Sequence, residues 1–246
     1  MYLEEIGYKS SRIKVLTDKK KYFKVAFEEL VKQRSLIESY ISKNKFFEVS
    51  LKPISVGRNV ASIIKVMVES ARVANVGPMA SVAGTLAEFV VRRMIQEGAK
   101  VAIVENGGDI FAITDRLVRI GVFSGNNIFS GKFAFELDKH NTPLAICSSS
   151  SFLGHSLSFG ECDLAIVFSN SGGIADAVAT ALANRIIREE DIKEGLEWAV
   201  GLKDVNGAMI IKGSKVGMIG VIPALVKAED KDIGKKVTKD IYWFDF

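Results

Sequence analysis

Apolar residues recur at helical spacing in five segments of the chain. They lie three or four positions apart, so each segment presents one apolar face to a core. Gly77-Pro78 separates the second segment from the third, and Gly98 is suited to end the third. The predicted helices are 29–44, 60–74, 85–98, 174–188 and 191–202.

Shorter runs that alternate or are apolar throughout predict strands. Several of these runs are joined by tight turns, such as Asn106-Gly107 and Gly213-Ser214. Because hairpins are frequent and helices come in blocks, we expect an α+β fold with a largely antiparallel mixed sheet and packed helices. The predicted strands are 11–17 and 22–28 (an N-terminal hairpin turning at 18–21), 100–105, 109–113, 116–124, 131–137, 143–149, 163–169, 207–212 and 215–220.

Composition limits the class of protein. The 246 residues are 48% hydrophobic and 25% charged, which is ordinary for a soluble chain with a sizeable core. We expect one domain over residues 1–246, compact or built from two closely packed lobes. No apolar run approaches the roughly 18 residues that span a bilayer, and the first 22 residues have neither an apolar signal core nor a cysteine. These features predict a cytoplasmic protein without a membrane partner.

Charge and cysteine usage argue against a nucleic-acid-binding protein and against a structural zinc site. Residues 1–52 hold 12 Lys and Arg against 7 Asp and Glu, and the excess gathers near 18–24 without interleaved glycine. That pattern favours a solvated turn over a nucleic-acid surface, and an acidic protein partner is the alternative. Cys147 and Cys162 lack metal-ligand spacing and are expected as buried thiols. The apolar surplus is compatible with a homodimer.

The stretch "SNSGGIADAVATALANRI" at 169–186 carries two polar side chains in an apolar helix. Asp176 and Thr180 are four residues apart and therefore share a helix face. A carboxylate with a hydroxyl suits Mg²⁺ or Ca²⁺, and the glycine-rich start of the helix suits phosphate oxygens. The alternative is structural: Asp176 complements the helix dipole and Thr180 bonds back to a carbonyl.

Three further segments are rich in small residues. In "ENGGDI", Gly107 and Gly108 precede Asp109 and allow a ligand to approach the backbone, or they simply form a hairpin turn. In "VGPMASVAG", the small side chains of 77–84 leave room for a flat ring or a phosphate, or for close helix packing. In "CSSSSFLGHSLSFG", His155 is a candidate acid or base, or an ordinary loop histidine.

In their order along the chain, these four segments resemble the ApbE superfamily, best known for the FAD:protein FMN transferases. "ENGGDIFAI" resembles that family's "NAGGDI", and "ADAVATALAN" resembles its "ADALATAL". "SSSSFLGH" is similar to its threonine-serine-glycine segment with the following histidine, and "GPMASVAG" lies where the family has "GAIAKG". The resemblance covers about 77–186 and implies an ApbE-like fold.

The resemblance also implies a site. Its Mg²⁺ ligands would be Asp176, Thr180 and the carbonyl of Ala80, and its catalytic residue His155. Mg²⁺ and FAD or FMN are the implied cofactors, and a protein acceptor of FMN is the implied partner beside the nucleotide. The implied cofactor-binding residues are Gly77, Ala80, Gly107, Gly108, Asp109, Ser149 and Ser150.

Two departures from the family pattern leave the activity open. His155 leads into "SLSFG" without the family's aspartate, and Ser81 stands where the family has lysine. The sequence therefore supports two functions: a Mg²⁺-dependent flavin-nucleotide protein that transfers FMN or cleaves the FAD pyrophosphate, and a non-catalytic module that binds a nucleotide or phosphometabolite.

Overall fold

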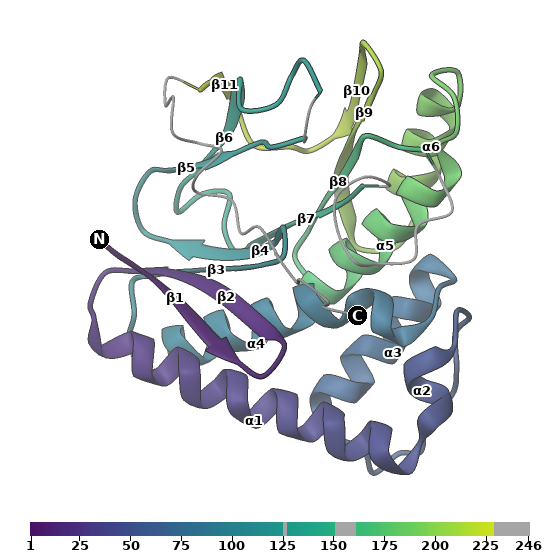
Figure 1. Ribbon diagram of the computed structural model, residues 1–246. Coiled ribbons are helices and arrows are strands. Elements are labelled where there is room, and N and C mark those ends of the chain that lie inside the picture. The colour runs from purple at the N-terminus through teal and green to yellow at the C-terminus, as the bar shows by residue number, and fades with distance from the viewer. Residues whose placement is uncertain (125–126, 151–160, 229–246) are drawn as a thin grey trace, which may run out of the picture.

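The computed structural model describes residues 1–124, 127–150 and 161–228. Two sheets and a layer of helices make up this part of the chain (Figure 1). The helices are α1 (Lys21–Lys43), α2 (Lys45–Val49), α3 (Ser62–Ala74), the 3₁₀ turn η1 (Pro78–Ser81), α4 (Val82–Gln96), α5 (Gly172–Arg185) and α6 (Asp191–Val200).

The larger sheet has eight strands in the order β1-β2-β3-β4-β7-β8-β9-β10. The smaller sheet has the order β11-β6-β5, and every neighbouring pair in both sheets is antiparallel. The predicted α+β class and antiparallel character are confirmed. The strands are β1 (Tyr2–Tyr8), β2 (Ser11–Thr17), β3 (Val101–Asn106), β4 (Asp109–Thr114), β5 (Val118–Gly121), β6 (Phe133–Leu137), β7 (Leu144–Ser149), β8 (Leu164–Ser169), β9 (Val205–Lys212), β10 (Lys215–Gly220) and β11 (Leu225–Lys227).

The large sheet is covered on both faces, which explains its continuous apolar strands. Helices α1, α4, α5 and α6 lie against one face, and the small sheet lies against the other (Figure 1). In β8, Ala165 and Val167 belong to the core under the helices, whereas Ile166 and Phe168 belong to the core under the small sheet. Alternate residues of one strand therefore serve two different cores.

The N-terminal hairpin is not the predicted one. Strand β2 pairs with β1, turning at Lys9 and Ser10, and residues 22–28 are the first turns of α1 instead of a strand. Tyr22, Ala26 and Leu30 are buried at helical spacing, so this segment continues the periodicity of 29–44. The alternation in 22–28 fits either structure locally, and the packing of one long helix on the sheet decides between them.

The hairpin between β3 and β4 is confirmed, but its turn lies one residue later than predicted. Asn106 pairs with Asp109, and the two positive φ angles belong to Gly107 (64°) and Gly108 (98°). Glycine is the residue for which such angles cost least. Asp109 is thereby fixed as the first residue of β4, at the sheet end that faces α4.

Candidate functional site

The predicted metal-binding helix α5 meets α4 at an unusually close crossing. A Cβ atom on Gly84 would overlap the carbonyl oxygen of Gly172, and a Cβ atom on Gly172 would overlap the carbonyl oxygen of Gly84. The two helices can approach this closely only because both positions lack a side chain. The small residues of 77–84 thus serve close helix packing at Gly84, one of the two alternatives that the sequence left open.

Each helix caps the other at this crossing. The N–H of Gly84 donates to Asp176 Oδ2 at 2.9 Å, and the N–H of Gly172 donates to Glu88 Oε2 at 2.7 Å. The residues at the two N-cap positions are Ser81, before α4, and Ser171, before α5. Neither side chain caps its own helix with a hydrogen bond. Because the first N–H groups of a helix lack partners within it, an acid from the neighbour satisfies them and interacts with the positive helix end.

Asp109 approaches the crossing from the sheet. Its Oδ1 accepts a hydrogen bond from the N–H of Ser148 at 3.2 Å, and Ser148 Oγ donates to the carbonyl of Gly108 at 3.0 Å. Asn106 Nδ2 donates to the carbonyl of Ala83 at 3.2 Å. The β3–β4 turn, the end of β7 and the start of α4 are therefore held together around two buried carboxylates, Asp109 and Asp176.

Burial disfavours the charged form of both acids. Desolvation raises the pKa of Asp176 to about 7, although the amides of Gly84 and Ala83 act in the opposite direction. Desolvation likewise raises the pKa of Asp109 well above its ordinary value, and the charge on Asp176 raises it further. Desolvation and then the two carboxylates raise the pKa of the buried Cys147 thiol, which keeps that group neutral.

The other predicted ligands lie on neighbouring elements. Ala80 is in η1, which packs against α5, and Thr180 is one turn beyond Asp176 on α5; both are partly exposed. Ser149 ends β7 and Ser150 follows it, buried. A Cβ atom on Gly77 would overlap the carbonyl oxygen of Ser50, so this glycine permits close packing, and its part in cofactor binding stays a prediction.

His155, the predicted acid or base, lies outside the described residues, so its position relative to the carboxylates stays a prediction. Glu88 was missed by the sequence reasoning. A signal for it exists: Gly84 and Glu88 have the same four-residue spacing as Gly172 and Asp176. Two such pairs on packed helices would indicate reciprocal capping.

The donor set fits a hard cation that takes few ligands from the protein. Across residues 1–124, 127–150 and 161–228, no group of three or more His, Cys, Asp and Glu side chains is arranged to hold a metal. Mg²⁺ commonly uses one or two carboxylates and takes its other ligands from water and substrate phosphate. Asp109 and Asp176 provide such a pair, and a nearby cation would offset the cost of ionising both in a buried place.

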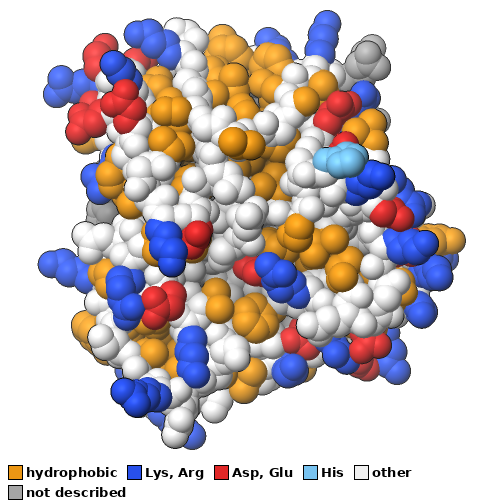
Figure 2. Space-filling model, turned by 180° about the vertical axis from the view of Figure 1, so that it is seen from behind, with side chains coloured by type: hydrophobic (Ala, Val, Ile, Leu, Met, Phe, Trp, Pro, Cys, Tyr) orange, Lys and Arg blue, Asp and Glu red, His pale blue; other side chains and the backbone are white. Residues whose placement is uncertain are grey.

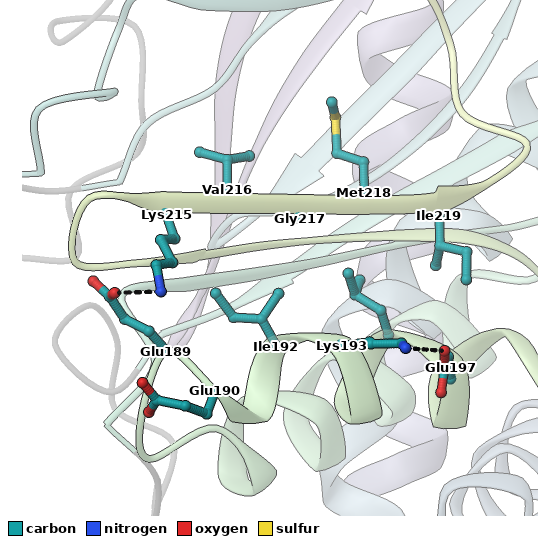
Figure 3. Close-up of a pocket in the computed structure, with 11 residues that line it drawn as sticks. Glu189, Glu190, Ile192, Lys193, Glu197, Lys215, Val216, Gly217, Met218 and Ile219 are labelled. Atoms are coloured by element: carbon teal, nitrogen blue, oxygen red, sulfur yellow. Dashed lines mark ion pairs between the residues drawn. The ribbon is translucent and has the colours of Figure 1, made fainter.

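A groove of about 580 Å³ lies elsewhere, between α6 and β10 (Figure 3). Its lining includes Ile192 and Met218, and ion pairs join Lys215 to Glu189 and Lys193 to Glu197 at its edges. None of the predicted site residues lines it. The groove therefore does not serve as the binding cleft of the Asp109–Asp176 site.

Comparison with known proteins shows the family of the chain. The family model described as AbpE bacteria matches residues 7–197, which include Asp109, Asp176 and Thr180. The chain belongs to this family. A UPF0280 protein of Methanocaldococcus jannaschii is 40% identical over 246 residues, covering 98% of this chain and 99% of the relative.

Two solved structures share the fold of this AbpE bacteria family member. The flavinyl transferase ApbE of Pseudomonas stutzeri, in its apo form, matches with a TM-score of 0.53 at 12% identity, covering 89% of this chain and 94% of that one. The ApbE protein of Thermotoga maritima matches with a TM-score of 0.52 at 12% identity, covering 97% and 100%. The ApbE-like fold expected from the sequence is confirmed.

Within the part of the chain that the structure describes, no single helix combines the length and the apolar composition of a membrane span. The pair Ser62–Ala74 and Pro78–Gln96 meets them only when joined, by length and composition alone, and the two parts are bent by 102°.

Proposed function

We propose that this protein binds FAD with Mg²⁺ and transfers its FMN part to a hydroxyl group of an acceptor protein. The observation that carries the proposal is the pair of buried carboxylates, Asp109 and Asp176, at the junction of the β3–β4 turn with the starts of α4 and α5. Two structural neighbours, the flavinyl transferase ApbE of Pseudomonas stutzeri and the flavin transferase ApbE of Vibrio cholerae, support the flavin chemistry.

The proposed Mg²⁺ ligands come from Asp176 and from the elements around it. Its carboxylate would bind the cation, Thr180 would add a hydroxyl one turn away, and the carbonyl of Ala80 would approach from η1. Asp109 supplies a second negative charge from the sheet side. Mg²⁺ in this place would neutralise the charge that develops on the pyrophosphate during transfer.

The backbone and the serines would hold the rest of the nucleotide. Gly107 is exposed and Gly108 partly exposed in the turn beside the carboxylates, and Ser149 and Ser150 follow Ser148 at the end of β7. In the transfer, the acceptor oxygen forms a bond to the FMN phosphorus, the pyrophosphate P–O bond breaks, and AMP leaves. His155 is the residue we propose to take the proton of the acceptor hydroxyl.

The test is AMP release from FAD, followed by chromatography, with Mg²⁺ and then with EDTA. We expect AMP only with Mg²⁺, and faster release when a hydroxyl-bearing acceptor peptide is added. The absence of AMP under every condition would reject the transferase.

A second function is favoured by one observation. "HSLSFG" lacks the aspartate that the family has after its histidine, so the chain could hold FAD, FMN or another phosphorylated ligand without turnover. Fluorescence titration with FAD, FMN and ATP separates the two functions. Tight Mg²⁺-dependent binding without AMP would identify a binding module.

A further inference from the structure

The end of the molecule formed by α2 exposes apolar side chains without a covering element in the described part of the chain. Phe46 and Val49 are each 67% exposed, and Leu51 is 59% exposed. These three exposed apolar residues lie within six positions of the chain, and we call them the α2 patch. Scattered exposed apolar residues are ordinary, but a clustered set that is bordered by charge is typical of a binding surface.

Basic residues surround the α2 patch. Lys43, Lys45, Lys52 and Arg58 are exposed, and within the described ranges none of them has an acidic oxygen within 4.0 Å. Glu48 is the one acid in the sequence from 43 to 58. At the lower left of Figure 2, the end that α2 occupies, basic side chains lie beside hydrophobic ones. This charge is complementary to an acidic partner.

The surface is also hollowed. A groove of about 530 Å³ lies between the C-terminal end of α1, α2 and residues 53–55. Tyr40 and Phe46 line it, and the Tyr40 ring packs edge to face on the buried Phe47 ring with the two centroids 5.0 Å apart. Asn44 and Ser55 add polar groups. A concave site with aromatic walls and polar groups accepts a side chain of a polypeptide, whereas a flat lipid surface would leave the hollow unfilled.

The α2 patch borders the segment that carries a proposed ligand. Ser50 and Leu51 follow α2, and their backbone lies so close to Gly77 that no side chain fits there. Gly77 precedes η1, which contains Ala80 and packs against both α2 and α5. A polypeptide that docks on the patch is therefore held next to η1, the element from which the Ala80 carbonyl would approach the proposed cation.

We propose that the α2 patch and its groove dock an acidic polypeptide segment with an apolar anchor, and that this segment belongs to the acceptor protein. The assignment to the acceptor rests on the proposed function, whereas the docking itself does not. Phe46 and Leu51 bury against the anchor, and Lys43, Lys45 and Lys52 bind the acids on either side.

Fluorescence anisotropy with synthetic peptides tests the docking in the absence of FAD and Mg²⁺. The probe is a fluorescein-labelled peptide in which Asp and Glu flank a Leu-Phe pair, and its control has Lys at the acidic positions. We expect the acidic peptide to bind, and its affinity to fall by about tenfold or more as salt rises from about 50 to about 500 mM. The lysine peptide should not bind.

Variants locate the contact. Phe46→Ser/Leu51→Ser and Lys43→Gln/Lys45→Gln/Lys52→Gln should each weaken peptide binding by about tenfold or more. Leu117→Ser, at 57% exposure, and Lys132→Gln/Lys227→Gln, both exposed on or beside the small sheet, are matched controls and should bind as the parent does. The melting temperature of each variant is measured beside its affinity, and we expect all variants to fold.

Three outcomes overturn the docking proposal: equal binding of the acidic and basic peptides, parental affinity in the patch variants, or patch-dependent binding to phosphatidylglycerol vesicles without peptide binding. AMP release from FAD is measured separately. If the patch variants release AMP normally in the absence of an acceptor yet lose the acidic peptide, both proposals stand. If the parent binds the peptide but releases no AMP, the docking stands and the transferase fails.

Discussion

At the scale of single residues, Asp176 combines a structural and a chemical property. One of its oxygens accepts the N–H of Gly84, while its charge faces a second buried carboxylate, Asp109. The hydrogen bond explains why an acid is tolerated in the apolar helix α5. Desolvation by burial raises the pKa of Asp176 to about 7. A substitution that removes the charge of Asp176 but keeps its hydrogen-bond acceptor separates these two properties.

The first prediction concerns Asp176→Asn. The asparagine oxygen can still accept the Gly84 N–H and no buried charge remains to be desolvated, so we expect the fold to survive. Mg²⁺-dependent FAD binding should disappear, because the carboxylate charge that holds the cation is gone. Thr180→Val should weaken binding less, since a hydroxyl carries no formal charge. Calorimetric titration and melting of the same samples test this, and parental affinity in Asp176→Asn would rule out the metal site.

The second prediction concerns pH. In the folded protein the pKa of Asp176 is about 7 against an ordinary value of 3.8, so between these values the native state binds more protons than the unfolded state. The free energy of unfolding of the metal-free protein should therefore fall as pH rises through this window and level off above it. The slope should be smaller in Asp176→Asn. Mg²⁺ should stabilise the parent more at pH 8 than at pH 5, because it binds the ionised pair. Urea unfolding in EDTA and in Mg²⁺ measures both effects. A free energy of unfolding that rises with pH between 3.8 and about 7 in EDTA would contradict this prediction.

At the scale of elements, α4 and α5 each cap the N-terminus of the other helix. Each helix has a glycine at the contact and an acid four residues later, and each acid caps the glycine N–H of the other helix. The Glu88 carboxylate also pairs with Arg92 at 2.7 Å, which keeps its second oxygen satisfied. The position of Asp176 therefore depends on the spacing of two helices as much as on its own helix.

The third prediction tests this spacing. In Gly84→Ala the new Cβ would overlap the Gly172 carbonyl and lie 2.8 Å from the Asp176 Cβ, so the helices must move apart. We expect a loss of roughly 1–3 kcal/mol in the free energy of unfolding, as for other overpacked cores, and weaker Mg²⁺-dependent FAD binding. Gly57→Ala is the matched control, since nothing lies within 4 Å of its added Cβ. Equal stability of the two variants in urea would show that the crossing is not tight.

At the scale of the whole molecule, one sheet joins two cores. Strands β3, β4, β7, β8 and β9 each contribute to the core under the helices and to the core under the small sheet. The third cluster, among α1, α2, α3 and α4, shares α1, α3 and α4 with the first. Loss of packing on one face therefore weakens the strands that support the other.

The fourth prediction follows from this sharing. We expect the chain to unfold as one domain, with a single transition in which the calorimetric and van't Hoff enthalpies agree. Melting curves from far-UV circular dichroism and from tryptophan fluorescence should coincide. Two resolved transitions would instead show that the small sheet and its core unfold independently.

The sequence alone determined most elements and the chemical types at the site. Helical spacing from 60 to 74 and from 85 to 98 corresponds to α3 and α4, and Gly213-Ser214 is the turn between β9 and β10. These patterns succeed because hydrophobic period and turn chemistry are local properties of the chain. The same locality placed Asp176 and Thr180 on one helix face.

Only the tertiary structure decided which segments act together. Residues 22–28 alternate locally, yet they are helical because Tyr22 and Ala26 pack in the core under α1. Glu88 and Gly172 are 84 positions apart, and Gly84 and Asp176 are 92 apart, so no local pattern contains their hydrogen bonds. The close crossing of α4 and α5 and the burial of Asp109 beside Asp176 arise from packing on the sheet. Burial then sets the raised pKa of both acids, which makes an ordinary pair of aspartates a candidate cation site.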